Sequence, residues 1–99
     1  NRVGYYVVTE LREPARNAKE IAVDLKLLDR GNSAKVNIYY LASGTWNFAE
    51  FCMVNQETTC RKQFSGGDSP TISKVMVTNA GTKNEVQRPV YVSDVRVRT

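Results

Sequence analysis

Apolar and polar residues alternate along most of this chain, which is the pattern of half-buried β-strands. The clearest such segments are residues 3–11, 35–41, 45–54, 60–64, 71–78 and 89–98. Clusters of Gly, Asn, Ser and Pro separate them, for example at 65–70 and 79–84, and such clusters are typical of turns. With one further segment, the pattern predicts an all-β chain of about seven antiparallel strands that form a two-sheet β-sandwich.

The further segment, residues 19–28, fits two elements. As a strand, its apolar residues alternate with polar or small ones. As part of a helix over 14–30, they form one apolar stripe, with a proline near the first turn and a glycine past the end. The turn cluster at 29–33 and the clear strand at 35–41 favour a strand that forms a hairpin. The alternative is an α+β fold, with that helix packed on an antiparallel meander.

Two pairs of adjacent tyrosines lie in predicted strands. Neighbouring strand residues face opposite sides of a sheet, so one member of each pair points outward. We expect Tyr6 and Tyr39 to be the outward members, with Tyr40 joining Val36 and Ile38 inside. Outward tyrosines can bind a sugar or a protein, although cross-strand aromatic packing would also explain them.

Trp46 is the single tryptophan and follows a Ser-Gly-Thr sequence at a loop edge. At such a place its ring could stack on a sugar, whereas in a small sandwich a lone Trp is most often part of the core. The amides of Asn37 and Asn47 suit sugar hydroxyl groups. The candidate ligand-binding residues are therefore Trp46, Tyr39, Tyr6, Asn37 and Asn47.

Composition narrows the classes of function. A chain of 99 residues makes a single domain, 1–99. Its net charge of +4 is spread along the chain, so we expect no nucleic-acid partner. No apolar run approaches the roughly 20 residues of a membrane span. The chain has no His, which removes Ser–His and Cys–His nucleophiles, and we expect no enzymatic activity.

The two cysteines, Cys52 and Cys60, are separated by seven residues with a turn-like middle. A hairpin there would bring them within disulfide reach. A disulfide implies an oxidising compartment, so we expect an extracellular or cell-surface location. The alternative is two unpaired thiols in the core.

The C-terminal stretch, residues 88–97 (Arg-Pro-Val-Tyr-Val-Ser-Asp-Val-Arg-Val), resembles the closing strand of jelly-roll carbohydrate-binding modules, which are galactose-binding-like β-sandwiches. Residues 23–46 are similar to the middle of such modules. The resemblance implies a jelly-roll fold and glycan binding. It also implies a structural calcium held by an Asp on the last strand and an acidic residue near the first. The matching positions are Asp94 and Glu10, which would otherwise be surface charges.

Two functions follow from these features. The first is a non-catalytic, lectin-like carbohydrate-binding module of a secreted or cell-surface protein, with a polysaccharide or glycan as partner. The second is a structural or protein-interaction module, such as a surface-fibre subunit, an adhesin domain or an inhibitor. In the second case another protein would meet the edge strands and the outward tyrosines.

Overall fold

The fold is all-β, as the alternation predicts. The computed structural model describes residues 2–4, 6–27, 33–80 and 90–99. Segment 19–28 contains a strand, so the helix considered for 14–30 is not formed. The elements are β1 (Arg2–Gly4), β2 (Tyr6–Ala15), β3 (Glu20–Leu27), β4 (Ala34–Ala42), β5 (Thr45–Val54), β6 (Glu57–Gln63), a short 3₁₀ turn η1 (Gly66–Asp68), β7 (Ile72–Asn79) and β8 (Val90–Arg98).

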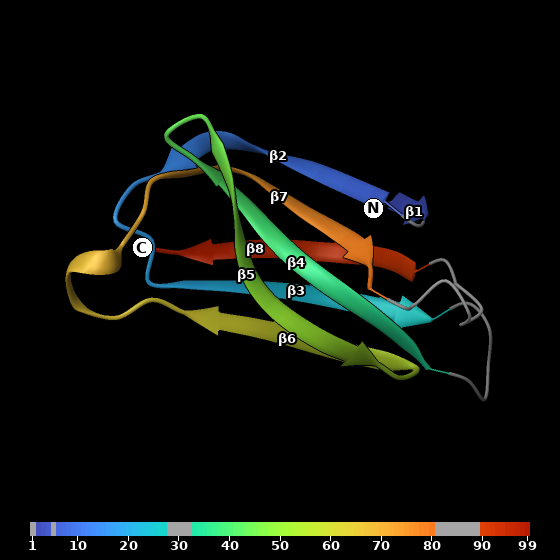
Figure 1. The fold of residues 1–99 in the computed structure, drawn as a ribbon. Coiled ribbons are helices and arrows are strands. Elements are labelled where there is room, and N and C mark those ends of the chain that lie inside the picture. The colour runs from blue at the N-terminus through green and yellow to red at the C-terminus, as the bar shows by residue number, and fades with distance from the viewer. Residues whose placement is uncertain (1, 5, 28–32, 81–89) are drawn as a thin grey trace.

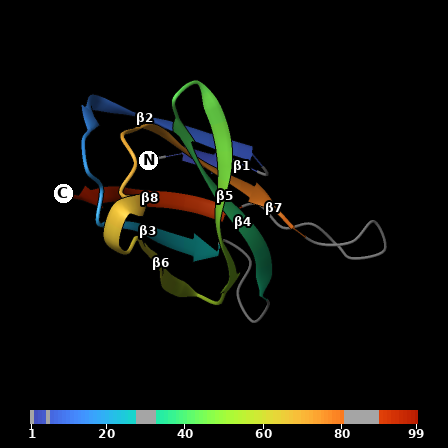
Figure 2. The ribbon, with the colours of Figure 1, turned by 60° about the vertical axis from the view of Figure 1, so that its left-hand side comes forward.

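The strands form two antiparallel sheets of four, which lie face to face as two layers (Figures 1 and 2). Sheet A has the order β1-β8-β3-β6 and sheet B the order β2-β7-β4-β5. This confirms the predicted two-sheet sandwich. The final strand, β8, lies inside its sheet between β1 and β3, and the three-residue β1 is the strand beyond the expected seven.

The pairing follows the rule of a jelly roll, in which the chain doubles back on itself. The first strand pairs with the last, β2 with β7, β3 with β6, and β4 with β5. The point of doubling is the tight turn at Ser43 and Gly44, whose φ angles are +53° and +73°. Two successive positive φ angles define the hairpin turn whose twist matches that of the flanking strands. Eight strands in this order form a double-sheet jelly roll.

The core lies between the sheets and is built from the inward members of each alternating pattern. In β3 the buried positions include every second residue from Ile21 to Leu27, which is the period of a strand with one face toward the core. One contiguous cluster joins both sheets, and its largest fully buried side chains are Ile21, Val23, Leu25, Val36, Ile38, Val54, Ile72, Val75, Val90 and Val92.

The N-terminal segment differs from the expectation of one strand over 3–11. It is divided between β1 in sheet A and β2 in sheet B. β2 also continues past Pro14 to Ala15. A proline is tolerated there because β2 is an edge strand, whose outer side needs no backbone N–H donor.

Consecutive strands also cross between sheets where hairpins were expected. β3 and β4 lie in different sheets, so segments 19–28 and 35–41 do not form a hairpin. Most of the turn at 29–33, the loop at 79–84 beyond residue 80, and the first two residues of 88–97 lie outside the described residues. Among the described residues no helix has the length and apolar character to cross a bilayer.

The expected disulfide forms between Cys52 and Cys60, with a Cα–Cα distance of 6.2 Å. Its geometry is not that of a hairpin, because β5 belongs to sheet B and β6 to sheet A. The bond therefore joins the two layers at one edge of the sandwich. Cys60 is itself a buried member of the apolar cluster, and Cys52 packs against that cluster.

We predict that opening this bond lowers the free energy of unfolding by about 2–3 kcal/mol, because an eight-residue separation restricts the unfolded chain by that amount. Urea unfolding of the oxidised protein, the reduced protein and the Cys52→Ala/Cys60→Ala variant measures the loss. Equal midpoints for the oxidised and reduced forms would contradict the prediction.

Candidate functional site

The exposed large apolar side chains concentrate on strand β5. They are Tyr6 (64% exposed), Trp46 (38%), Phe48 (56%), Phe51 (47%) and Met53 (42%), and all but Tyr6 belong to β5. Burying a side chain of this size stabilises a fold by roughly 1.5–3 kcal/mol. Exposure of a cluster of them is therefore the feature of the surface that most needs an explanation.

A β-bulge places these side chains on one face. Near the end of β5, Cys52 and Val54 point inward, opposite Val36 and Ala34 of β4. The register then shifts so that Ile38 pairs with Glu50 and Tyr39 with Phe48, which leaves Ala49 as the extra residue. Without that residue, Phe48 and Trp46 would face inward like Cys52, because every second residue of a strand faces the same side. With it, they share the outward side with Phe51 and Met53.

The outward residues of sheet B line up in three cross-strand rows. Each row takes one residue from each strand, and its β5 member is an exposed aromatic residue. Read from β2 to β5, the rows are Tyr6, Thr78, Asn37 and Phe51; Val8, Met76, Tyr39 and Phe48; and Glu10, Lys74, Leu41 and Trp46. We call these rows, with Met53, the aromatic face.

Four of the five candidate ligand-binding residues lie on this face. Tyr6 and Asn37 belong to the first row, Tyr39 to the second and Trp46 to the third. The Tyr39 and Phe48 rings contact edge to face, with centroids 5.7 Å apart, a favourable geometry for two aromatic rings.

Asn47 lies away from the aromatic face. The bulge gives it the inward parity of Tyr40, its partner in β4. Its Nδ2 donates a hydrogen bond of 2.9 Å to the Thr45 carbonyl. The amide thus supports the end of the β4–β5 hairpin instead of joining Trp46.

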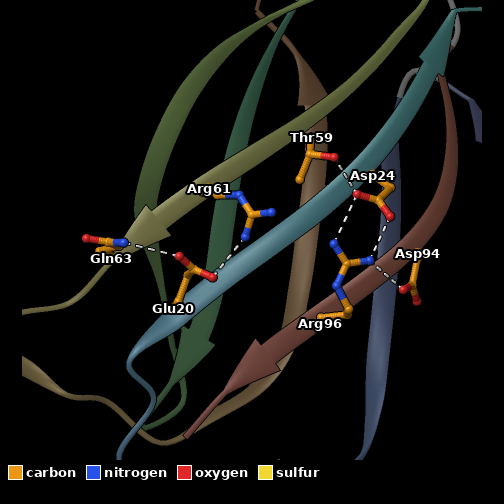
Figure 3. Close-up of polar contacts among 7 residues, drawn as sticks. All are labelled: Glu20, Asp24, Thr59, Arg61, Gln63, Asp94 and Arg96. Atoms are coloured by element: carbon orange, nitrogen blue, oxygen red, sulfur yellow. Dashed lines mark hydrogen bonds and ion pairs between the residues drawn. The ribbon is translucent and has the colours of Figure 1, made fainter.

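The outer face of sheet A has the opposite character, because hydrogen-bonded charges cover it (Figure 3). Arg96 Nη1 donates to Asp24 Oδ2 at 2.6 Å and to Asp94 Oδ2 at 2.7 Å. Thr59 donates to Asp24 from the neighbouring strand at 2.7 Å. We call this network, together with the one around Glu20, the charged face.

The second network centres on Glu20, which accepts from Arg61 at 3.1 Å and from Gln63 at 3.3 Å. The Gln63 amide and the Arg61 charge hold the pKa of Glu20 below its ordinary value of 4.5. Hydrogen bonds from Arg96 and Thr59 likewise hold the pKa of Asp24 below 3.8. These carboxylates are occupied by cations and hydrogen-bond donors of the chain itself.

The two residues matched to a calcium site do not fit one. Glu10 projects from the aromatic face, with an oxygen 4.0 Å from Lys74 Nζ. Asp94 lies on the charged face beside Arg96. The layers of a sandwich are about 10 Å apart, and calcium–oxygen distances are about 2.3–2.6 Å, so these two carboxylates cannot share an ion. Within the described ranges, no three Asp, Glu, Cys or His side chains group as a metal site.

Comparison with known proteins gives no match to a family model, to a curated protein or to a solved structure.

The charged face generates a prediction about acid stability. Because the pKa of Asp24 is lowered on folding, its contribution to stability is present above the unfolded value near 3.8 and is lost as the pH falls through the lowered value. Asp24→Asn should therefore flatten the fall of stability in acid, and Thr59→Val should do so less. Thermal unfolding from about pH 7 to about pH 2 measures this; parallel profiles for wild type and Asp24→Asn would contradict it.

Proposed function

We propose that this chain is a non-catalytic carbohydrate-binding module of a secreted or cell-surface protein, and that the aromatic face is its binding surface. The observation that carries the proposal is the set of three cross-strand rows, each ending in an exposed aromatic ring on β5. The C–H groups of a pyranose ring suit the negative face of an aromatic ring. A face of several rings on a rigid sheet offers a glycan successive stacking positions.

Polar groups between the rings would supply hydrogen bonds. Asn37 lies in the row of Tyr6 and Phe51, next to the row of Tyr39, and its amide offers both a donor and an acceptor. Thr78 stands between Tyr6 and Asn37. Sites for small ligands commonly combine aromatic walls with a few such groups, which fix orientation.

Two further features support this proposal. The Cys52–Cys60 disulfide suits an oxidising, extracellular setting. The jelly-roll strand order agrees with the fold that the resemblance of residues 88–97 implies. Calcium is no part of the proposal, because the residues matched to it are held apart.

The test is a glycan array probed with the oxidised protein, with and without EDTA, followed by titration of the best ligand. Trp46→Ala and Tyr39→Ala should each weaken binding about tenfold, because the stacking of one aromatic ring on a sugar corresponds to roughly 1–1.5 kcal/mol. EDTA should have no effect.

Tyr91→Ala is the matched control, because Tyr91 pairs with Lys26 on the outer side of sheet A. It should leave affinity unchanged. A blank array, or an equal loss in Tyr91→Ala and Tyr39→Ala, would count against the aromatic face as a glycan site.

One observation favours a protein-interaction module as the second candidate. β5 is an edge strand of ten residues whose only charge is Glu50. Exposed edges usually carry more charge or a proline, because they otherwise pair with other chains. Phe and Met are also common at protein interfaces.

This second candidate predicts assembly by strand addition. Sedimentation over a hundredfold concentration range would show a rise in mass, and Phe51→Lys, which adds a charge to the edge strand, would abolish it. A constant monomer mass in a protein that responds to glycans would remove this candidate in favour of the first.

A further inference from the structure

A cleft opens between the two layers beside the aromatic face. Its volume is about 360 Å³, and its lining residues are Tyr40, Phe48, Lys62, Gln63, Phe64 and Ser65. Cavities of roughly 300 Å³ and above are large enough for small ligands. Phe48 belongs both to the cleft and to the second row of the aromatic face, so the two surfaces are continuous.

Aromatic rings from both layers form its walls. Tyr40 takes the inward parity of β4 in sheet B, and Phe64 follows the end of β6 in sheet A. The two rings meet edge to face with centroids 5.2 Å apart. Both also pack against the buried core, so the walls are held in place before any ligand arrives.

Lys62 is unusual because it occupies an inward position. In β6 it shares the side of buried Cys60, and it lies opposite Ile21 of β3, which is also buried. Lys62 is half-buried, and a cation that is partly withdrawn from water is less costly when it has a partner. Here the ammonium group lies 6.0 Å from the centroid of the Phe64 ring, in a cation–π contact.

In the part of the chain that the structure describes, no carboxylate neutralises the charge of Lys62, since no Asp or Glu oxygen there lies within ion-pair distance of its ammonium. The cations of the charged face differ, since Arg61 and Arg96 are both paired with acids. An unneutralised cation beside aromatic rings suits a ligand that joins an apolar ring face to an anionic group.

We propose that the cleft binds the carboxylate-bearing sugar of an acidic glycan, a uronic acid residue. The sugar ring packs against Phe48 and the neighbouring rings, and its carboxylate accepts from Lys62 Nζ. Gln63 and Ser65 supply donors and acceptors for hydroxyl groups. This inference rests on the proposed function and adds a ligand class to it: the glycan on the aromatic face is acidic, and one of its acidic residues enters the cleft.

The experiment compares two probes by calorimetric titration: an oligosaccharide of glucuronic acid residues, and the same oligosaccharide after reduction of its carboxyl groups to alcohols. We expect the acidic form to bind about fivefold more tightly, as expected for one partly exposed ion pair. The preference should shrink as salt is added.

Lys62→Gln should remove the preference and leave affinity for the reduced oligosaccharide within about twofold, because only the ion pair is removed. Lys62→Arg, which keeps the charge, should retain it. The matched control is Lys26→Gln, which removes the same charge from the opposite face, where Lys26 pairs with Glu57 at 3.3 Å. Circular dichroism and thermal unfolding check that each variant is folded.

The outcomes separate the two proposals. If both probes bind equally to the wild type, or if Lys26→Gln abolishes the preference as fully as Lys62→Gln, the acidic-sugar inference is overturned while glycan binding stands. If neither probe binds and the glycan array is blank, both proposals fail. Binding of a polyglutamate peptide with the same Lys62 dependence, without binding of either oligosaccharide, would replace the sugar with an acidic peptide.

Discussion

The structure depends on strict alternation of side chains across its strands, and its candidate site depends on one interruption of that alternation. Each sheet has an inward and an outward face, and a shift of one residue exchanges them. In β5 the extra residue, Ala49, makes this exchange once, in mid-strand. In an uninterrupted strand, Phe48 and Phe51 would face opposite sides of the sheet. In the fold they share the outer face. A bulge thus sets the composition of the aromatic face, in keeping with the frequent occurrence of bulges near binding sites.

The same physics explains what the sequence could predict of the fold. Strand existence follows from local alternation, and segments 45–54 and 71–78 match β5 and β7 closely. Which strands pair with each other does not follow from local alternation. β3 and β4 lie in opposite sheets, and so do β5 and β6, although the local sequence suggests hairpins between them. Among the described strands, only β4 and β5 pair with each other as consecutive strands of a hairpin. The partners of the other strands are distant in sequence, because a jelly roll pairs each strand by its place in the doubled chain.

The candidate site was predictable to the extent that alternation held. The regular strand β4 placed Tyr39 and Asn37 outward and Tyr40 inward, as parity required. Beyond the bulge, simple alternation predicts the wrong side: Asn47 faces inward, and Phe48 lies with Phe51 on the outer face. β8 behaves similarly, since a shift at Ser93 lets Val95 and Val97 follow Val90 and Val92 toward the core. The cleft could not be foreseen, because Tyr40 and Lys62 belong to different sheets and meet only in the folded chain.

The outer faces of the two sheets differ in how their exposed side chains are paired. The charged face carries carboxylates and guanidinium groups that pair with one another within the chain. The aromatic face exposes rings that are not members of the buried core cluster. Among the charged residues, Lys62 resembles these exposed rings. It lines the aromatic cleft, and no described acid forms an ion pair with it. Exposed apolar surface and an unneutralised charge lie side by side around Phe48, and a ligand with an apolar ring face and a carboxylate satisfies both.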